Sequence, residues 1–242
     1  MAYGLTKSLD LELSSRQYTT ASDSASLSIT GNMTIEGWIK LESGGDAQDL
    51  ITKWTPTGNQ RSYVVRINPT SGNVQLYVSS NGTAQGNANV AYSFSTGVWV
   101  HVAVVYTAAS SQMELFIDGV SQGTANGTLP TSGNDNGSAV LVGAIEPEAP
   151  GAFLDGKISL LRIWSSARTG SEISANMCNV FGGATSNLSA EWSFDDVYTD
   201  ASGNGNTLTP INSPVFSTDT PAICAVEEVT QIYPTLSMLG VG

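Results

Sequence analysis

Alternation of apolar and polar positions dominates the sequence and predicts β-strands. In the segment 33–41, apolar residues occupy one face of an extended chain, and Trp38 and Lys40 fall on the opposite face. Two similar runs, 62–67 and 73–79, flank a turn that contains Pro and Gly, so we expect a hairpin. A further run, 112–118, ends in a dipeptide typical of tight turns, Asp118-Gly119.

Two other segments are apolar on both faces. The run 98–106 predicts a strand at the centre of a sheet that is covered on each side, and 153–164 is similar apart from a break at 155–157. Helical features occur in one segment, where Thr169 can cap a short helix that runs to Cys178, with Glu172 in its first turn. Roughly a dozen short strands with frequent turns predict an all-β fold, an antiparallel two-sheet sandwich or a barrel.

The chain is organised as one domain with a tail. Its length of 242 residues suits a single β domain, and no fixed-period repeat or Pro-rich linker divides it. We therefore expect residues 1–225 to form the domain. Residues 226–242 form a tail with several apolar side chains, which either packs on its own sandwich or docks on a neighbouring subunit or partner.

Charge excludes two classes of partner. Nine Lys and Arg face 21 Asp and Glu, a formal net charge of −12. Scattered cations cannot form the basic surface that nucleic acids require, nor one that docks on an anionic membrane. No apolar run is long enough for membrane insertion. A strong negative charge agrees with solubility or with cation binding.

The compartment is ambiguous. The composition, poor in Lys and rich in Ser, Thr, Asn and Gly, is typical of extracellular proteins, but residues 1–7 lack the basic and apolar run of a signal peptide. Either a signal has been removed, or the protein is made in a cytoplasm and released by lysis, as virion components are. We favour the second explanation and expect an extracellular or virion-surface location.

The two cysteines leave two interpretations open. Cys178 and Cys224 can close a disulfide around the 45 residues between them, a bridge worth about 4 kcal/mol in the chain-entropy model. Alternatively, they are buried free thiols that act as small apolar side chains. The spacing of cysteine and histidine does not match a structural zinc site.

Several segments carry a family resemblance. They are 9–13, 33–40, 99–106, 114–119, 153–158, 161–168 and 201–206. In this order they resemble the laminin G-like and pentraxin-like jelly rolls of the concanavalin A-like lectin/glucanase superfamily. The resemblance implies two stacked antiparallel sheets, and we expect the rings of Trp38, Trp99 and Trp164 to fill the space between them. It does not imply one activity, because the superfamily contains lectins, adhesion modules, lyases and glucanases.

Catalytic residues are not expected. Glucanases of this superfamily carry two Glu flanking an Asp on one strand face, about 5 Å apart in retaining enzymes, and this run is absent. Pro147 makes the pair Glu146 and Glu148 part of a loop. The single histidine, His101, lies in the doubly apolar strand, where we expect a packed, hydrogen-bonded side chain.

Calcium is the one cofactor that the sequence suggests. The oxygen-bearing side chains of Asp200, Ser202, Asn204 and Asn206 alternate in a Gly-containing loop, which can supply the oxygens that calcium prefers. The alternative is an Asx-turn loop whose hydrogen bonds are satisfied internally.

The predicted function is a non-catalytic surface, adhesion or decoration module, such as a phage capsid or appendage protein, that binds glycans. Glycan binding needs exposed aromatic rings beside polar groups, for which Trp54, Tyr92 and Tyr198 are candidates. We expect a protein assembly and glycans as partners, and homo-oligomers are compatible with the sequence. The alternatives are a secreted calcium-dependent carbohydrate-binding module and a polysaccharide-degrading enzyme.

Overall fold

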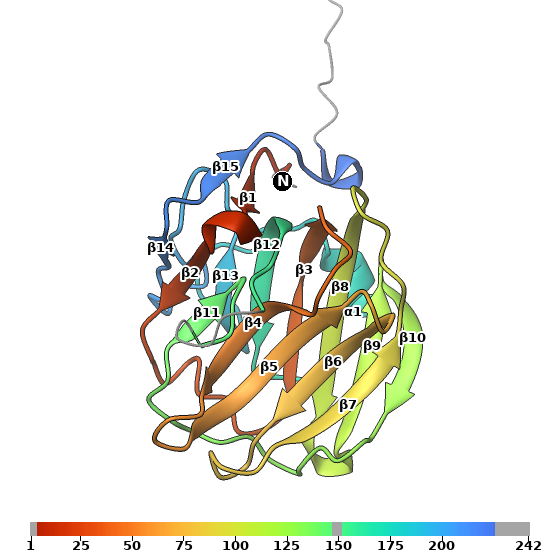
Figure 1. Cartoon of the computed structure of the whole chain (residues 1–242), viewed down its shortest axis with the longest axis vertical. Helices are drawn as coiled ribbons and strands as arrows, with labels where there is room; N and C mark the ends of the chain where they lie inside the picture. Colours follow the sequence, from red (N-terminus) through yellow and green to blue (C-terminus); the bar gives the residue numbers. More distant parts are fainter. Residues whose placement is uncertain (1–3, 147–151, 226–242) are drawn as a thin grey trace, which may run out of the picture.

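The computed structural model describes residues 4–146 and 152–225. Two antiparallel sheets stack face to face in this part of the chain, with one short α-helix behind them (Figure 1). The predicted all-β sandwich is confirmed. The tail that we predicted at 226–242 lies outside the described residues.

Sheet A is the eight-stranded layer, drawn behind the other in Figure 1. Its main path has the order β10-β9-β8-β3-β12-β1-β15, and β13 also pairs with β12. The strands are β1 (Ser8–Leu11), β3 (Met33–Leu41), β8 (Trp99–Thr107), β9 (Gln112–Ile117), β10 (Val120–Ala125), β12 (Gly156–Trp164), β13 (Leu188–Trp192) and β15 (Val215–Ser217).

Sheet B is the seven-stranded layer, in the order β14-β2-β11-β4-β5-β6-β7. Its strands are β2 (Tyr18–Ala21), β4 (Gln48–Thr55), β5 (Gln60–Asn68), β6 (Asn73–Val78), β7 (Gly86–Ala91), β11 (Val140–Val142) and β14 (Thr209–Ile211). The expected hairpin at 62–79 is β5 and β6, paired from Tyr63 with Val78 to Asn68 with Asn73.

The main core lies between the two sheets. Alternate residues of each strand supply it, as the period of two requires: Val100, Val102 and Val104 of β8 face Val65 and Leu76 of sheet B across a continuous apolar cluster. The opposite faces of the strands point away from this core, and on sheet A part of that face is covered by α1 and the segment that follows it.

The turn between β9 and β10 depends on left-handed backbone at two successive residues. Asp118 has φ 49° and Gly119 has φ 77°, as a tight hairpin turn requires. A Cβ on Gly119 would lie 2.8 Å from Cβ of Ser174, because the helix packs closely against this turn.

The helix α1 (Gly170–Asn176) begins as the sequence predicts. Thr169 and Glu172 form a reciprocal capping box. The hydrogen bonds that Glu172 accepts from the backbone and side chain of Thr169 lower the pKa of Glu172. Buried Ile173 packs against the outer face of sheet A, beside Ala103 and Phe116.

The expected position of the three tryptophans between the sheets is wrong. Trp38 and Trp99 belong to a separate cluster on the outer face of sheet A, with Met177 and Cys178, and Trp164 is buried outside the main core. The alternation of β3 had already assigned Trp38 to the face opposite Met33. Trp38 is buried and Trp99 is half-buried, because the segments that contain Met177 and Cys224 pack over this part of sheet A.

Cys178 and Cys224 form a disulfide in the structure, with Cα atoms 5.1 Å apart. The sequence left open whether the two cysteines are bridged or free, and in the structure they are bridged. The bond joins the segment that follows α1 to the short 3-10 helix at Ala222–Cys224.

Candidate functional site

The outer face of sheet B presents polar side chains in two rows that cross the strands. One row contains Asp49, Arg66, Gln75 and Asn89, which are cross-strand neighbours on β4, β5, β6 and β7. The second row contains Thr52, Val64, Tyr77 and Asn87. We call these two rows, together with the neighbouring pair Trp54 and Arg61, the outer platform.

Two aromatic rings lie within the outer platform, each beside a guanidinium group. Arg66 lies 5.5 Å from the centre of the Tyr77 ring, and Arg61 lies 6.0 Å from the Trp54 ring. Trp54 is 5% exposed and forms part of the floor. Tyr77 is half-buried, so part of its ring remains accessible.

The charges of the outer platform are fixed by a paired interaction. Nε of Arg66 donates to Oδ1 of Asp49 at 2.7 Å, and its Nη2 donates to Oδ2 at 2.9 Å. This hydrogen bonding raises the pKa of Arg66. Asp49 is fully buried, so the pair holds the guanidinium in place against the ring of Tyr77.

A small cavity of about 170 Å³ lies beside these rings. It is lined by Trp54, Val64, Arg66, Tyr77, Gln85 and Ile145. The hydroxyl group of Tyr77 donates to Oε1 of Gln75 at 2.9 Å, so the phenol is tied to the row of amides. An accessible ring surrounded by amide and guanidinium groups can stack on an apolar face of a ligand and hydrogen-bond to its hydroxyl groups.

The three aromatic residues named from the sequence are not brought together. Trp54 belongs to the outer platform. Tyr92 packs edge-on against Phe94 with ring centres 4.7 Å apart, and Tyr198 packs against Phe216 at the same distance. Both tyrosines lie against the main core, as packing residues do. A ligand-binding role for either residue remains a prediction.

Sequence reasoning missed Tyr77, although a signal exists. In β6, Val74, Leu76 and Val78 face the core, so Tyr77 and Gln75 must lie on the opposite face. A tyrosine between amides on the polar face of a strand therefore marks the outer platform.

The loop proposed as a calcium site uses its oxygens internally. Asp200 accepts hydrogen bonds from the main-chain N–H of Glu191, Ser202 and Asn206. The side-chain nitrogens of Asn204 and Asn206 donate to the main-chain oxygen of Ser189. These contacts are those of the Asx-turn alternative, and calcium at this loop remains a prediction.

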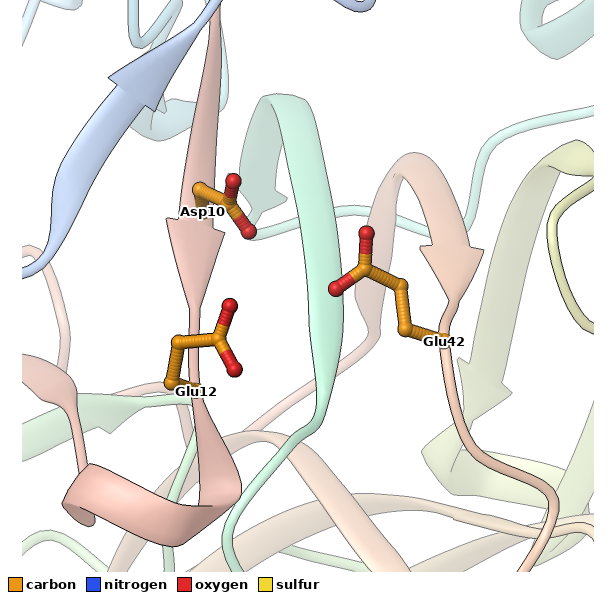
Figure 2. Close-up of side chains that lie close together, drawn as sticks. All are labelled: Asp10, Glu12 and Glu42. Carbon is orange, nitrogen blue, oxygen red and sulfur yellow. The ribbon is translucent and has the colours of Figure 1, made fainter.

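A different group of carboxylates converges on sheet A. Asp10, Glu12 and Glu42 each offer an oxygen, and these oxygens lie within 4.8 Å of one another (Figure 2). Nζ of Lys157 lies 3.0 Å from Oδ2 of Asp10 and also contacts Glu42, so the group is partly neutralised by an ion pair.

His101 is packed, but the expected hydrogen bonds of its ring are not found. Neither ring nitrogen has a partner among the described residues, and Nε2 lies 3.6 Å from Oε2 of Glu36. Burial, aided by the positive charge of Arg162, lowers the pKa of His101 to about 3, so the ring is neutral. The ring meets that of Trp38 edge-on at 5.3 Å.

A family model described as the concanavalin A-like lectin/glucanases superfamily, of laminin G type, matches residues 13–174. The chain belongs to this superfamily. The resemblance seen in the sequence is thus confirmed, as is the jelly-roll sandwich that it implies. No curated protein matches the sequence.

Solved structures share the fold of this superfamily member at low sequence identity. A candidate carbohydrate-binding protein from Bacteroides ovatus ATCC 8483 aligns with a TM-score of 0.66 and 20% identity over 89% of the chain, which spans 60% of that protein. A heptameric SAP-like pentraxin from Limulus polyphemus aligns with a TM-score of 0.64 and 14% identity, over 92% of this chain and 98% of its own.

A third similar structure contains a bound sugar. It is the CBM40 of the Ruminococcus gnavus IT-sialidase with α2,3-sialyllactose, with a TM-score of 0.53 and 16% identity over 72% of this chain and 100% of its own. At these identities the three structures establish the fold of the chain and not its ligand. Within the described residues, no helix is long and apolar enough to cross a membrane.

Proposed function

We propose that this protein is a glycan-binding module whose outer platform holds the sugar. The observation that carries the proposal is the accessible ring of Tyr77 among Gln75, Arg66 and Asn87 on the open face of sheet B. Sugars have apolar C–H faces and rims of hydroxyl groups, so a ring surrounded by amides suits both surfaces. The carbohydrate-binding relatives among the similar folds support this choice.

A non-catalytic role agrees with the charges of the outer platform. Its two rows and its ring pair contain one carboxylate, Asp49, which accepts hydrogen bonds from Nε and Nη2 of Arg66. Glycoside hydrolysis generally needs two carboxyl groups that flank the scissile bond. We therefore propose binding without cleavage at this face.

The test is a glycan array followed by titration calorimetry with the glycans that bind. Replacing Tyr77→Ala removes the stacking surface, and we expect at least a tenfold loss of affinity, about 1.4 kcal/mol. Tyr92→Ala is the control, because it removes the same side chain at the alternative aromatic position that the sequence suggested, where the ring packs against Phe94. The control is expected to bind as the wild type does.

Three results would overturn the proposal. The first is binding of no glycan by a folded wild-type protein. The second is unchanged affinity in Tyr77→Ala and Gln75→Ala for a glycan that the wild type binds. Loss of affinity in Tyr92→Ala alone would move the site to the edge of the sandwich and would also overturn it.

Calcium-dependent glycan binding is a second candidate, favoured by the convergence of Asp10, Glu12 and Glu42. Carboxylate oxygens are the ligands that calcium prefers, but Lys157 already binds two of the three. At the other candidate site, the carboxylate of Asp200 already accepts hydrogen bonds from main-chain N–H groups. We expect glycan affinity at the outer platform to survive a chelator, and a loss on chelation would favour the calcium-dependent form.

We further propose that the module acts outside cells, on a surface such as a virion or a cell envelope. The disulfide supports an oxidising compartment, because such bonds persist there. The acidic charge of −12 supports a body that stays soluble while it is displayed. Immunogold labelling of purified particles tests the virion form of this proposal, and label confined to the soluble fraction would contradict it.

A further inference from the structure

A second cavity lies on the opposite side of the molecule, over the outer face of sheet A. It has a volume of about 570 Å³, within the range of small-molecule sites. Its lining is Trp38, Trp99, Asp118, Met177, Asp219, Thr220, Pro221, Ala222 and Ile223. This cavity, which we call the indole groove, shares no lining residue with the cavity of the outer platform.

The indole groove has walls that are fixed by specific bonds. The indole N–H of Trp38 donates to the main-chain oxygen of Met177 at 2.7 Å, and that of Trp99 donates to Oδ1 of Asp219 at 2.9 Å. The disulfide joins the residues that directly follow Met177 and Ile223. Two rings and a bridged pair of segments thus form a preformed apolar pocket.

Charge on this face is negative in spite of two lysines. Asp118 is exposed and has no cationic partner among the described residues, and its Oδ1 accepts the main-chain N–H of His101. Partial burial opposes ionisation of Asp219, but hydrogen bonds from Lys40 and Trp99 hold its pKa below the usual value. Lys40 is therefore neutralised locally, and Asp118 is left with an uncompensated charge.

The ion pairs nearby extend the negative region. Lys157, the cross-strand neighbour of Lys40, contacts Asp10 and Glu42. The two lysines are thus outnumbered by five carboxylates, those of Asp10, Glu12, Glu42, Asp118 and Asp219. This part of the face, around the indole groove, attracts cations.

We propose that the indole groove binds a small organic ammonium ion, with the apolar body of the ligand against Trp99 and Met177 and its ammonium group at Asp118. Indole is the aromatic side chain that attracts cations most strongly, and it also covers apolar groups. A carboxylate at the rim selects the charged amine over a neutral molecule of the same shape.

The experiment follows the indole N–H signals of the whole 242-residue chain by NMR during titration with phenethylammonium. We expect saturable shifts of the Trp99 and Trp38 signals at millimolar ligand, and binding about tenfold weaker for the neutral isostere 2-phenylethanol. In Asp118→Asn, which keeps the oxygen that accepts from His101, the amine should bind no better than the alcohol does.

Three results would overturn the proposal: no saturable shift, equal affinity for amine and alcohol, or unchanged amine binding in Asp118→Asn. Trp99→Ala should abolish the shifts of Trp38. If Trp99→Ala does not fold, the comparison of the wild type with Asp118→Asn still decides the test. Tyr77→Ala is the control for the other site. It should lose glycan binding and retain the amine, so the two proposals fail separately.

Discussion

The buried ion pair of Glu36 and Arg162 shows how single residues attach α1 and the segment after it to the outer face of sheet A. Oε1 of Glu36 accepts from the indole N–H of Trp164 at 2.7 Å and lies 3.3 Å from Nε of Arg162. The Nη atoms of Arg162 donate to the main-chain oxygens of Asn176 and Asn179. An ion pair with no exposed surface therefore ties the end of α1 to β3 and β12.

We expect Arg162→Met to lower the free energy of unfolding by about 3–5 kcal/mol, because Glu36 would be left as an unpaired buried charge. Urea denaturation measures the change. The double variant Glu36→Gln/Arg162→Met should recover part of the loss, since it removes both charges. A single variant within about 1 kcal/mol of the wild type would contradict this account.

Trp164 is the second residue whose removal should be costly. Its ring is 1% exposed, with Arg168 3.9 Å from the ring centre and Phe181 edge-on at 5.2 Å. Trp164→Ala should cost about 3–5 kcal/mol. Val120→Ala, at a position that is 64% exposed, is the control and should stay within about 0.5 kcal/mol. An equal melting temperature in the two variants would be inconsistent with burial of this ring.

His101 makes stability depend on pH. Its pKa is about 3 in the folded protein and about 6.5 in the unfolded chain, so the unfolded chain takes up the proton first as the pH falls. The stability contributed by neutral His101 is therefore present above about pH 6.5 and is lost progressively toward the folded pKa.

Denaturation of the wild type and of His101→Gln between about pH 6.5 and 5 measures this dependence, because most carboxylates are still ionised there. The wild type should lose stability on acidification more steeply than the variant, which has no group that titrates at this position. Parallel slopes would mean that His101 does not cause the effect.

At the scale of elements, alternation predicted the strands well but not what covers them. The hairpin of β5 and β6, the turn at Asp118-Gly119 and the start of α1 follow from local pattern and turn chemistry. The burial of Trp38 does not, because it depends on Met177, which is distant in the sequence. Likewise, Tyr77 can be assigned to an outer face from β6 alone, but its pairing with Arg66 needs the register of two strands.

At the same scale, the disulfide joins the two segments that contribute Met177 and Ile223 to the indole groove. The replacement Cys178→Ser/Cys224→Ser should lower the free energy of unfolding by up to about 4 kcal/mol, because the unfolded chain is no longer constrained. Chemical denaturation of this variant and of the wild type with and without reductant measures the loss. A transition that neither change shifts would show that the bridge does not stabilise the fold.

The whole molecule separates two kinds of surface on one scaffold. The main core between the sheets is closed and apolar, whereas the outer faces carry the outer platform on sheet B and the indole groove on sheet A. Composition and charge favoured some classes of partner over others, since a charge of −12 argues against polyanions such as nucleic acids. The proposed binding face could be recognised only from the fold, because its residues come from β4, β5, β6 and β7.

The most direct test of glycan binding at the outer platform is NMR mapping of backbone amides on addition of a glycan that the protein binds. The account predicts the largest shifts on β4 to β7, centred on Tyr77 and its cross-strand neighbours Val64 and Asn87. Shifts centred on the Asp200 loop, on Tyr198 or on the indole groove, with those strands unchanged, would contradict it.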